Sequence, residues 1–264
     1  DRKEAKRSDL YTQFAVAGAV QAMKDAGHAA GTYDPLRTGV IVGSGIGGIS
    51  TFEAQHDVLR DNGANRISAF FVPMFIGDIA SGVVSMRFHA KGPNYAVQSA
   101  CATSGHAIGD SFRMIQYGDA DVMICGGSEA SVSPMAMGGF TNMQALSERN
   151  DSPATASRPF DATRDGFVLG EGSGILILEE LEHAKRRGAK IYAEIAGYGA
   201  TGDAYHLTGQ PDAHEGLQRA MKKAMADAKM GPADVQYIDG DTDRVAFGMG
   251  TNGSRSTVLG GSAL

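Results

Sequence analysis

Short runs of β-branched residues that end in glycine alternate with helix-like segments along most of this chain. The run from Thr38 to Val42 is the clearest case, because it leads into Gly43-Ser-Gly where a helical pattern begins. Such alternation favours an α/β fold whose largely parallel sheet is buried between helices. We predict helices at about 8–27, 50–61, 74–88, 104–117, 179–187 and 212–229, and strands at about 38–42, 94–99, 121–125, 174–178, 191–198, 235–238 and, weakly, 256–259.

The composition excludes several classes of protein. With 264 residues, 42% of them hydrophobic, the chain can bury a substantial core. A formal net charge of −6 provides no overall basic field, so we expect neither nucleic acid nor a membrane as partner. No apolar run approaches the roughly 18 residues of a membrane span, and no apolar region of a signal peptide follows the first residues. Because two cysteines cannot form a disulfide framework, we expect a cytoplasmic protein.

Cys101 is the candidate nucleophile. It lies in Ser99-Ala-Cys-Ala-Thr-Ser-Gly, where an apolar strand ends and small residues open a helix. The positive end of a helix favours a thiolate, the small neighbours leave room for a substrate carbonyl, and the Cys101 N–H could donate to an oxyanion. The pattern alone is equally compatible with a buried cysteine that packs as a small hydrophobe.

The sequence context of the other candidate residues favours structural roles for them. Cys125 lies in a buried-strand pattern, and no His or Cys spacing suits a metal, so we expect no metal or other cofactor. His106 would face away from Cys101 on a helix, and His206 lies in a loop. Glu171, between two glycines, is interpreted as the acceptor of a structural hydrogen bond.

The loop from Gly43 to Gly48 formally satisfies the glycine pattern of dinucleotide sites. A dinucleotide fold needs a second strand that ends in an acidic residue about 20 positions on. The corresponding segment, Asp61-Asn-Gly-Ala-Asn-Arg, has the pattern of a loop instead. We therefore favour glycines that allow close packing beside a pocket, and keep a nicotinamide-dependent dehydrogenase as a minor hypothesis.

Several long motifs then occur in a fixed order. They are Lys91-Gly-Pro-Asn-Tyr-Ala-Val-Gln-Ser-Ala-Cys-Ala-Thr-Ser-Gly-His, Tyr117-Gly-Asp-Ala-Asp-Val-Met-Ile-Cys-Gly-Gly-Ser-Glu-Ala, Arg164-Asp-Gly-Phe-Val-Leu-Gly-Glu-Gly and Gly202-Asp-Ala-Tyr-His-Leu-Thr. From Arg2 to Ile238 the chain resembles the β-ketoacyl-acyl-carrier-protein synthases, and in particular the type II condensing enzymes of bacterial fatty-acid synthesis. The resemblance implies a thiolase-like αβαβα fold of five layers, built from two related halves and paired as a homodimer.

The resemblance also implies roles for individual residues. Cys101 would accept an acyl chain as a thioester, and the carbanion from decarboxylated malonyl carrier protein would attack that thioester. Ile46 would line the acyl pocket, and Phe71 would reach the pocket of the partner subunit across the dimer.

A second set of implied residues concerns the acyl carrier protein. Lys3, Lys6 and Arg7, which we place at the start of the first helix, match a basic patch that receives this acidic partner, with Thr208 at the tunnel mouth. A local positive patch on an acidic protein is physically suited to steering such a partner.

The chain departs from the family pattern near its end. Relatives carry two histidines and a lysine that serve decarboxylation in segments after the Tyr237-Ile238 strand, where this chain has Asp239-Gly-Asp-Thr-Asp. Phe247-Gly-Met-Gly-Thr-Asn-Gly-Ser resembles the family's terminal loop. We therefore divide the chain into an N-terminal half at 1–188 and a partial C-terminal half at 189–264, with the first strand also incomplete. The alternative function is a non-condensing, acyl-binding subunit like a chain-length factor; the missing histidines favour it and Cys101 argues against it.

Overall fold

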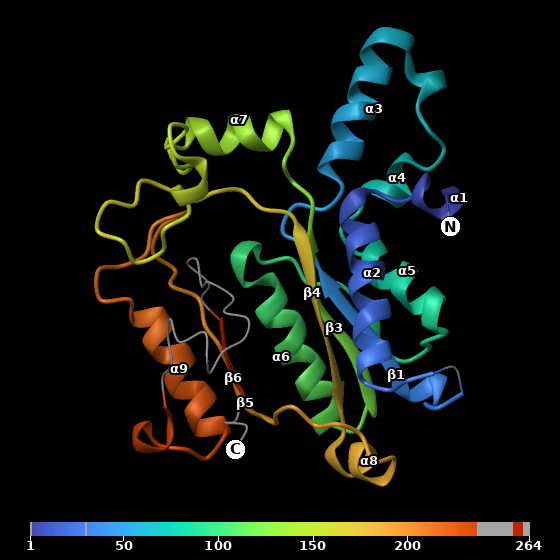
Figure 1. The fold of residues 1–264 in the computed structure, drawn as a ribbon, viewed down its shortest axis with the longest axis vertical. Helices are drawn as coiled ribbons and strands as arrows, with labels where there is room; N and C mark the ends of the chain where they lie inside the picture. The colour runs from blue at the N-terminus through green and yellow to red at the C-terminus, as the bar shows by residue number, and fades with distance from the viewer. Residues whose placement is uncertain (1, 30, 237–255, 261–264) are drawn as a thin grey trace.

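The computed structural model describes residues 2–29, 31–236 and 256–260, and Figure 1 shows their arrangement in layers. The helices are α1 (Arg2–Ala5), α2 (Leu10–Asp25), α3 (Ile49–Asn62), α4 (Phe71–Phe75), α5 (Ile79–Phe88), α6 (Thr103–Gln116), α7 (Pro134–Asn142), α8 (Leu181–Arg186) and α9 (Glu215–Asp227). The strands are β1 (Thr38–Gly43), β2 (Asn94–Tyr95), β3 (Val122–Glu129), β4 (Gly172–Glu179), β5 (Ile195–Ala200) and β6 (Ser256–Gly260).

The central sheet has the strand order β2-β1-β3-β4. β1 is parallel to both β2 and β3, whereas β4 is antiparallel to β3, with Val122 opposite Glu179 and Glu129 opposite Gly172. All residues of β1 and all but the last of β3 are buried. This continuous burial is typical of strands covered by helices on both faces, as the alternation in the sequence predicted.

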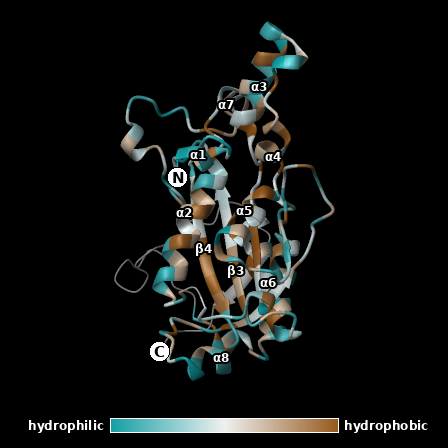
Figure 2. Cartoon of the chain, turned by 90° about the vertical axis from the view of Figure 1, so that its right-hand side faces the viewer, coloured by the Kyte–Doolittle hydropathy of each residue, from teal (hydrophilic) through white to brown (hydrophobic). Residues whose placement is uncertain are grey.

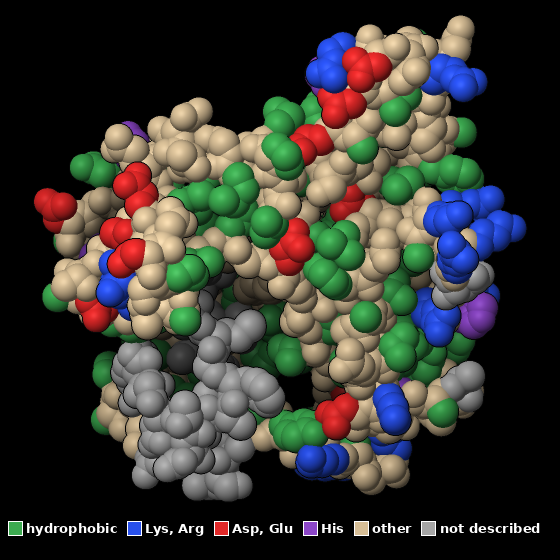
Figure 3. Space-filling model, turned by 45° about the horizontal axis from the view of Figure 1, so that its top comes forward, with side chains coloured by type: hydrophobic (Ala, Val, Ile, Leu, Met, Phe, Trp, Pro, Cys, Tyr) green, Lys and Arg blue, Asp and Glu red, His purple; other side chains and the backbone are tan. Residues whose placement is uncertain are grey.

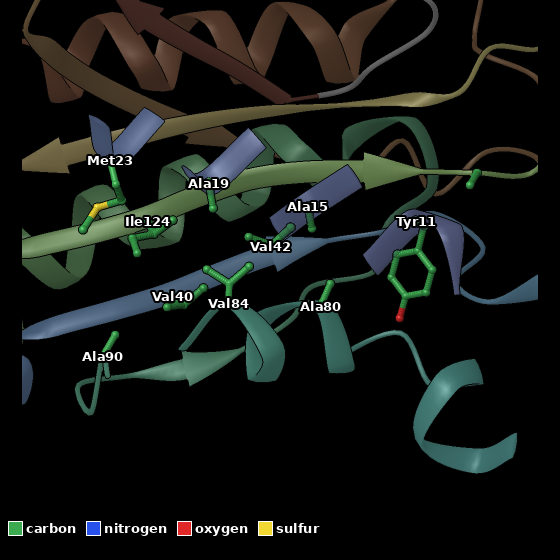
Figure 4. Close-up of a cluster of buried hydrophobic side chains, with 11 residues drawn as sticks. Tyr11, Ala15, Ala19, Met23, Val40, Val42, Ala80, Val84, Ala90 and Ile124 are labelled. Atoms are coloured by element: carbon green, nitrogen blue, oxygen red, sulfur yellow. The ribbon is translucent and has the colours of Figure 1, made fainter. Parts of the chain in front are cut away.

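Two hydrophobic clusters, one on each face, hold the helices to this sheet. On one face Val40, Val42 and Ile124 pack against α2 and α5, with Tyr11 and Met23 at the two ends of the cluster (Figure 4). On the other face Ile41 and Met123 pack against α6. Each such fully buried side chain contributes about 1.5–3 kcal/mol relative to exposure, so the two clusters supply much of the driving force. Figure 2 shows the corresponding hydrophobic residues along β3 and β4.

A second sheet lies beyond α6. β5 pairs with β6 in antiparallel orientation, and α9 covers its outer side, so that α6 contacts both sheets. Arg113 of α6 joins the layers: its guanidinium lies 2.9 Å from the carboxylate of Asp227, which also accepts the N–H of Tyr198. The order is therefore α2 and α5, central sheet, α6, second sheet, α9, which are the five layers that the resemblance implies (Figure 1).

The first long helix begins and ends close to the predicted positions. Asp9 is the N-cap of α2, and its carboxylate accepts the N–H of Tyr11 at 3.3 Å. The other oxygen of Asp9 accepts both the N–H and the hydroxyl of Thr51, at 3.0 and 2.6 Å. Gly27 follows the helix with φ of +72°, a conformation that favours glycine. One buried carboxylate thus ties the start of α2 to the start of α3.

Some predicted elements were wrong in extent. The helix predicted at 74–88 is divided into α4 and α5, because Tyr11 donates a hydrogen bond to the carbonyl oxygen of Ile76 and fixes the chain in the break. The strand predicted at 94–99 is only β2, and residues 235–236 do not form the start of a strand. α7 was not predicted. The cations expected at the start of the first helix instead occupy α1, which contains Lys3, and the following turn, which contains Lys6 and Arg7.

Candidate active site

A hollow of about 340 Å³ lies where β1 and β3 end. The carboxyl ends of parallel strands are the usual position of ligand sites in α/β sheets, because the chain leaves the sheet there in loops. The loop after β1, the end of β3, the start of β4 and the start of α6 meet at this edge. Its lining is Gly43, Ser44, Gly45, Ala100, Thr103, Ser104, Gly127, Ser128, Glu129, Gly172, Ser173 and Gly174.

Cys101 stands beside this hollow on a tight turn. It is the middle residue of a 3₁₀ turn, Ala100–Ala102, that leads directly into α6, and it is exposed. The preceding residue, Ala100, has φ of +49°, a left-handed conformation that costs a residue other than glycine about 1–2 kcal/mol. The turn is secured by a hydrogen bond from the N–H of Ser99 to the hydroxyl of Thr103 at 2.9 Å. The chain therefore presents this thiol at a helix N-terminus, as predicted from the small residues around it.

Glycines in the strands let the start of α6 approach the sheet. A Cβ atom on Gly43 would overlap the Thr103 side chain, and one on Gly127 would overlap the Ser104 hydroxyl. Any larger residue at these positions would push the turn that carries Cys101 away from the sheet. The glycine-rich strand ends are thus a packing requirement of the site.

His106 supports the turn that carries Cys101. Its Nδ1 lies 2.5 Å from the hydroxyl oxygen of Ser99, two residues before Cys101. The helical angle from Cys101 suggested that this histidine faces elsewhere. That reasoning overlooked Ser99, which the turn brings back over the first turns of α6.

Glu129 at the end of β3 holds the glycine loop after β1. One of its oxygens accepts the Ser44 hydroxyl at 2.9 Å, and the other accepts the N–H groups of Gly45 and Ile46 at 2.8 and 3.2 Å. The backbone donors that a dinucleotide phosphate would need are therefore already bound to a carboxylate. This geometry argues against the dehydrogenase hypothesis and supports the interpretation as a packing loop. Sequence reasoning missed Glu129, because its partners are 83 to 85 residues away in the chain.

The two residues expected to line acyl pockets lie on adjoining segments. Ile46 is half-buried in the glycine loop, and Phe71 begins α4. The two segments are joined by a hydrogen bond from the N–H of Gly48 to the carbonyl oxygen of Phe75 at 3.1 Å. Phe71 stacks on Phe75 with a ring-centroid distance of 5.7 Å, and Phe52 of α3 packs against both.

The residues expected to contact the carrier protein fall into two separate places. Lys3, Lys6 and Arg7 are exposed around α1, and the Arg7 guanidinium lies 4.6 Å from the ring centroid of Phe70. Figure 3 shows Lys and Arg side chains gathered on the side where Figure 1 places α1. Thr208 is exposed in the loop before α9, where the ring Nδ1 of His206 accepts its N–H at 3.2 Å. In Figure 1, α9 and the loop before it lie on the opposite side of the molecule from α1.

The remaining candidate groups have structural partners. Cys125 is fully buried in β3, and burial raises the pKa of its thiol to about 12, so it is protonated at neutral pH. Glu171 accepts the N–H of Val132 at 2.9 Å, which fits the structural role predicted for it. The described residues contain no group of His, Cys, Asp and Glu side chains that could hold a metal ion. The segments Asp239-Gly-Asp-Thr-Asp and Phe247 to Ser254 lie outside the described residues.

A larger hollow, of about 740 Å³, lies between β4, α6 and residues 189–196. Its lining is mainly apolar and includes no cysteine or serine. Two charged residues of its lining are paired with each other, since Arg187 donates to Glu179 at 2.5 and 2.7 Å. Burial raises the pKa of Glu179, but the hydrogen bonds from Arg187 and His183 outweigh it, so the net shift is downward. No neighbour of Cys101 lines this hollow, whereas Ala100 lines the smaller one, so the smaller hollow is the candidate site.

None of the helices in the described part of the chain has the length and apolar character needed to cross a bilayer.

The sequence matches two family models: the β-ketoacyl synthase N-terminal domain over residues 1–184 and the β-ketoacyl synthase C-terminal domain over residues 192–248. It is 54% identical, over 90% of its length, to a 3-oxoacyl-[acyl-carrier-protein] synthase 2 of Staphylococcus aureus. The chain spans 59% of that relative's length.

Solved structures agree with the sequence relatives. The fold is similar to that in a complex of a type II PKS acyl-carrier protein with its ketosynthase bound to the hexaketide, with a TM-score of 0.82 and 36% identity over 86% of this chain and 57% of that one. It is also similar to a β-ketoacyl synthase from Burkholderia phymatum, with a TM-score of 0.81 and 35% identity over 90% of this chain and 58% of that one. With its thiolase-like layers and an exposed cysteine at the start of α6, the chain belongs to the β-ketoacyl synthase family.

Proposed function

We propose that the protein is a condensing acyltransferase of fatty-acid synthesis, and that Cys101 is its nucleophile. The observation that carries the proposal is the exposed thiol on the left-handed turn at the start of α6, beside the hollow at the strand ends. The thiolate of Cys101 attacks the carbonyl carbon of an acyl thioester, a new thioester bond forms, and the donor thiolate leaves and takes up a proton. The Cys101 N–H at the helix terminus donates to the oxyanion that develops during this attack.

The second stage of the proposed reaction extends the acyl chain. A malonyl thioester loses CO₂, the electron pair left on its carbon attacks the carbonyl of the Cys101 thioester, and the cysteine leaves as thiolate. The product is a β-ketoacyl thioester on the carrier. The described residues include the proposed nucleophile of acyl transfer. The segment where the resemblance expects the decarboxylation histidines lies outside the described residues, and its sequence, Asp239-Gly-Asp-Thr-Asp, contains no histidine.

The non-condensing alternative is not favoured, because the relatives named above are synthases and the nucleophilic cysteine is present and exposed. Incubation with an acyl thioester and then a malonyl thioester separates the two functions. A condensing enzyme yields an adduct on the Cys101 peptide in the first step and CO₂ with a β-ketoacyl product in the second. An adduct on Cys125, or no adduct, contradicts the nucleophile; an adduct without product supports the non-condensing subunit.

We propose further that the protein acts as a homodimer in a reducing, cytoplasmic compartment. Support for the dimer comes from large apolar side chains left exposed on α3, α4 and α7, among them Phe52, Val72 and Met135. Because exposed apolar groups at this density mark interfaces, we assign this surface to a second copy of the chain, with Phe71 of α4 reaching the partner's pocket. The compartment is supported by the exposed, unpaired thiol of Cys101.

The proposed carrier-protein surface is the basic patch around α1, formed by Lys3, Lys6 and Arg7. The double charge reversal Lys6→Glu with Arg7→Glu is expected to raise KM for carrier-protein thioesters by about tenfold, since a like charge now faces an acidic partner. The increase shrinks as salt is added, because exposed charges are screened beyond about 10 Å at 0.1 M salt. Steady-state rates at several salt concentrations measure KM and its dependence on salt.

The matched control for the patch is the double reversal Lys222→Glu with Lys223→Glu. It changes the net charge by the same amount, at exposed positions of α9. It should leave KM for the carrier substrate unchanged. A short non-protein thioester should react at the wild-type rate with both variants. If the α1 reversal slows both substrates equally, the change acts on folding or on the pocket, and the docking surface lies elsewhere.

A further inference from the structure

One carboxylate accepts most of the side-chain hydrogen bonds of the glycine loop after β1. Glu129 accepts three hydrogen bonds from it, from the Ser44 hydroxyl and from the Gly45 and Ile46 N–H groups. The Ser44 hydroxyl, fixed by Glu129, accepts in turn the N–H of Gly47 at 2.9 Å. Four consecutive residues of the loop therefore depend on the position of a single side chain.

The loop has little conformational preference of its own. Gly47 has φ of +80°, and Gly45 leaves so little room that a Cβ atom there would lie 2.7 Å from the Glu129 carboxylate. Glycine-rich segments populate many backbone conformations, so external hydrogen bonds select one of them. Hydrogen bonds to a carboxylate are roughly twice as strong as those between neutral groups. Glu129, which accepts them here, is the last residue of β3, a buried strand of the central sheet. The rigid end of β3 thereby sets the position of the loop.

We propose that Glu129 is a positioning residue that selects the length of acyl chain accepted by Cys101. Its carboxylate fixes the backbone N–H of Ile46, and the Ile46 side chain in turn forms the wall of the acyl pocket. The inference rests on the proposed function, in which Cys101 carries the acyl chain and Ile46 lines the pocket. It adds a specificity determinant that acts through the backbone of the loop.

The test is Glu129→Gln, which keeps the size of the side chain but sets an NH₂ group against the loop's donors. The rate of Cys101 acylation is measured with a short and a long acyl thioester. The loss of one charge-assisted hydrogen bond corresponds to about tenfold, so we expect the wild-type preference between the two chain lengths to flatten by about that factor. The short-chain rate should fall less than the long-chain rate, since the turn of Cys101 is held separately by the hydrogen bond between Ser99 and Thr103.

The matched control is Glu53→Gln. Glu53 also accepts a serine hydroxyl and a backbone N–H, from Ser133 at 2.6 Å and Met135 at 2.9 Å, but it holds the start of α7 instead of the glycine loop. The Glu53→Gln variant should lose about as much thermal stability as the Glu129→Gln variant does. It should nevertheless keep the wild-type preference for chain length. A Glu129→Gln variant that also keeps the wild-type preference overturns the inference, as does a Glu53→Gln variant that flattens it equally. Failure of the wild-type protein to acylate at Cys101 would instead contradict the proposed function.

Discussion

Replacing Cys101 by alanine is expected to abolish acylation and condensation while leaving the fold intact. Alanine has no atom that can form the thioester, so the intermediate that divides the reaction into two steps no longer exists. The side chain is exposed on its turn, so its removal leaves no cavity in the core. Intact-protein mass after incubation with an acyl thioester, together with product formation, measures both effects, and the melting temperature should match that of the wild type.

The opposite behaviour is expected of Cys125→Ala. This thiol is buried within β3, where burial raises its pKa and keeps it protonated. Its removal should cost about 1–2 kcal/mol of stability through lost packing and leave the acylation rate unchanged. Product formation by Cys101→Ala, or loss of the adduct in Cys125→Ala with the fold retained, would show that Cys101 is not the nucleophile.

The strands and long helices could be predicted because their signals are local. The apolar run of β1 and the Asp9 cap of α2 are each contained in a few neighbouring residues. The break between α4 and α5 could not be found this way, since it depends on a hydrogen bond from Tyr11 to Ile76, 65 residues away. The apolar pattern continues through the break, whereas the contacts that fix it come from distant parts of the chain, Tyr11 and Gly48.

The same distinction holds for the site. The turn that carries Cys101 could be predicted from its own neighbours, because small residues after an apolar strand indicate a tight turn before a helix. Glu129 and the contact of His106 with Ser99 were missed, since a carboxylate at the end of a strand does not reveal its acceptor role. The candidate nucleophile carries a local signal, whereas the residues that hold its surroundings in place are defined by the fold.

The pairing of β3 with β4 in the central sheet depends on glycine at particular points. Gly126 in β3 is the most constrained: its φ is +142°, and a Cβ atom would overlap the carbonyl oxygen of Gly174 in β4. Gly126→Ala is therefore expected to destabilise the protein by on the order of 3 kcal/mol or more, because backbone strain and overpacking add. That is a large part of the roughly 5–15 kcal/mol that stabilises an ordinary domain, and denaturant unfolding measures it.

Gly138→Ala is the control, and its effect should have the opposite sign. Gly138 lies in α7, and nothing is within 4 Å of a Cβ atom placed on it. An alanine there reduces the backbone freedom of the unfolded chain without a clash, and should stabilise the protein by about 0.5–1 kcal/mol. Equal destabilisation by the two substitutions would mean that glycine in general, and not the contact between β3 and β4, determines the loss. Since β3 also carries Glu129, we expect Gly126→Ala to reduce Cys101 acylation even where the protein remains folded.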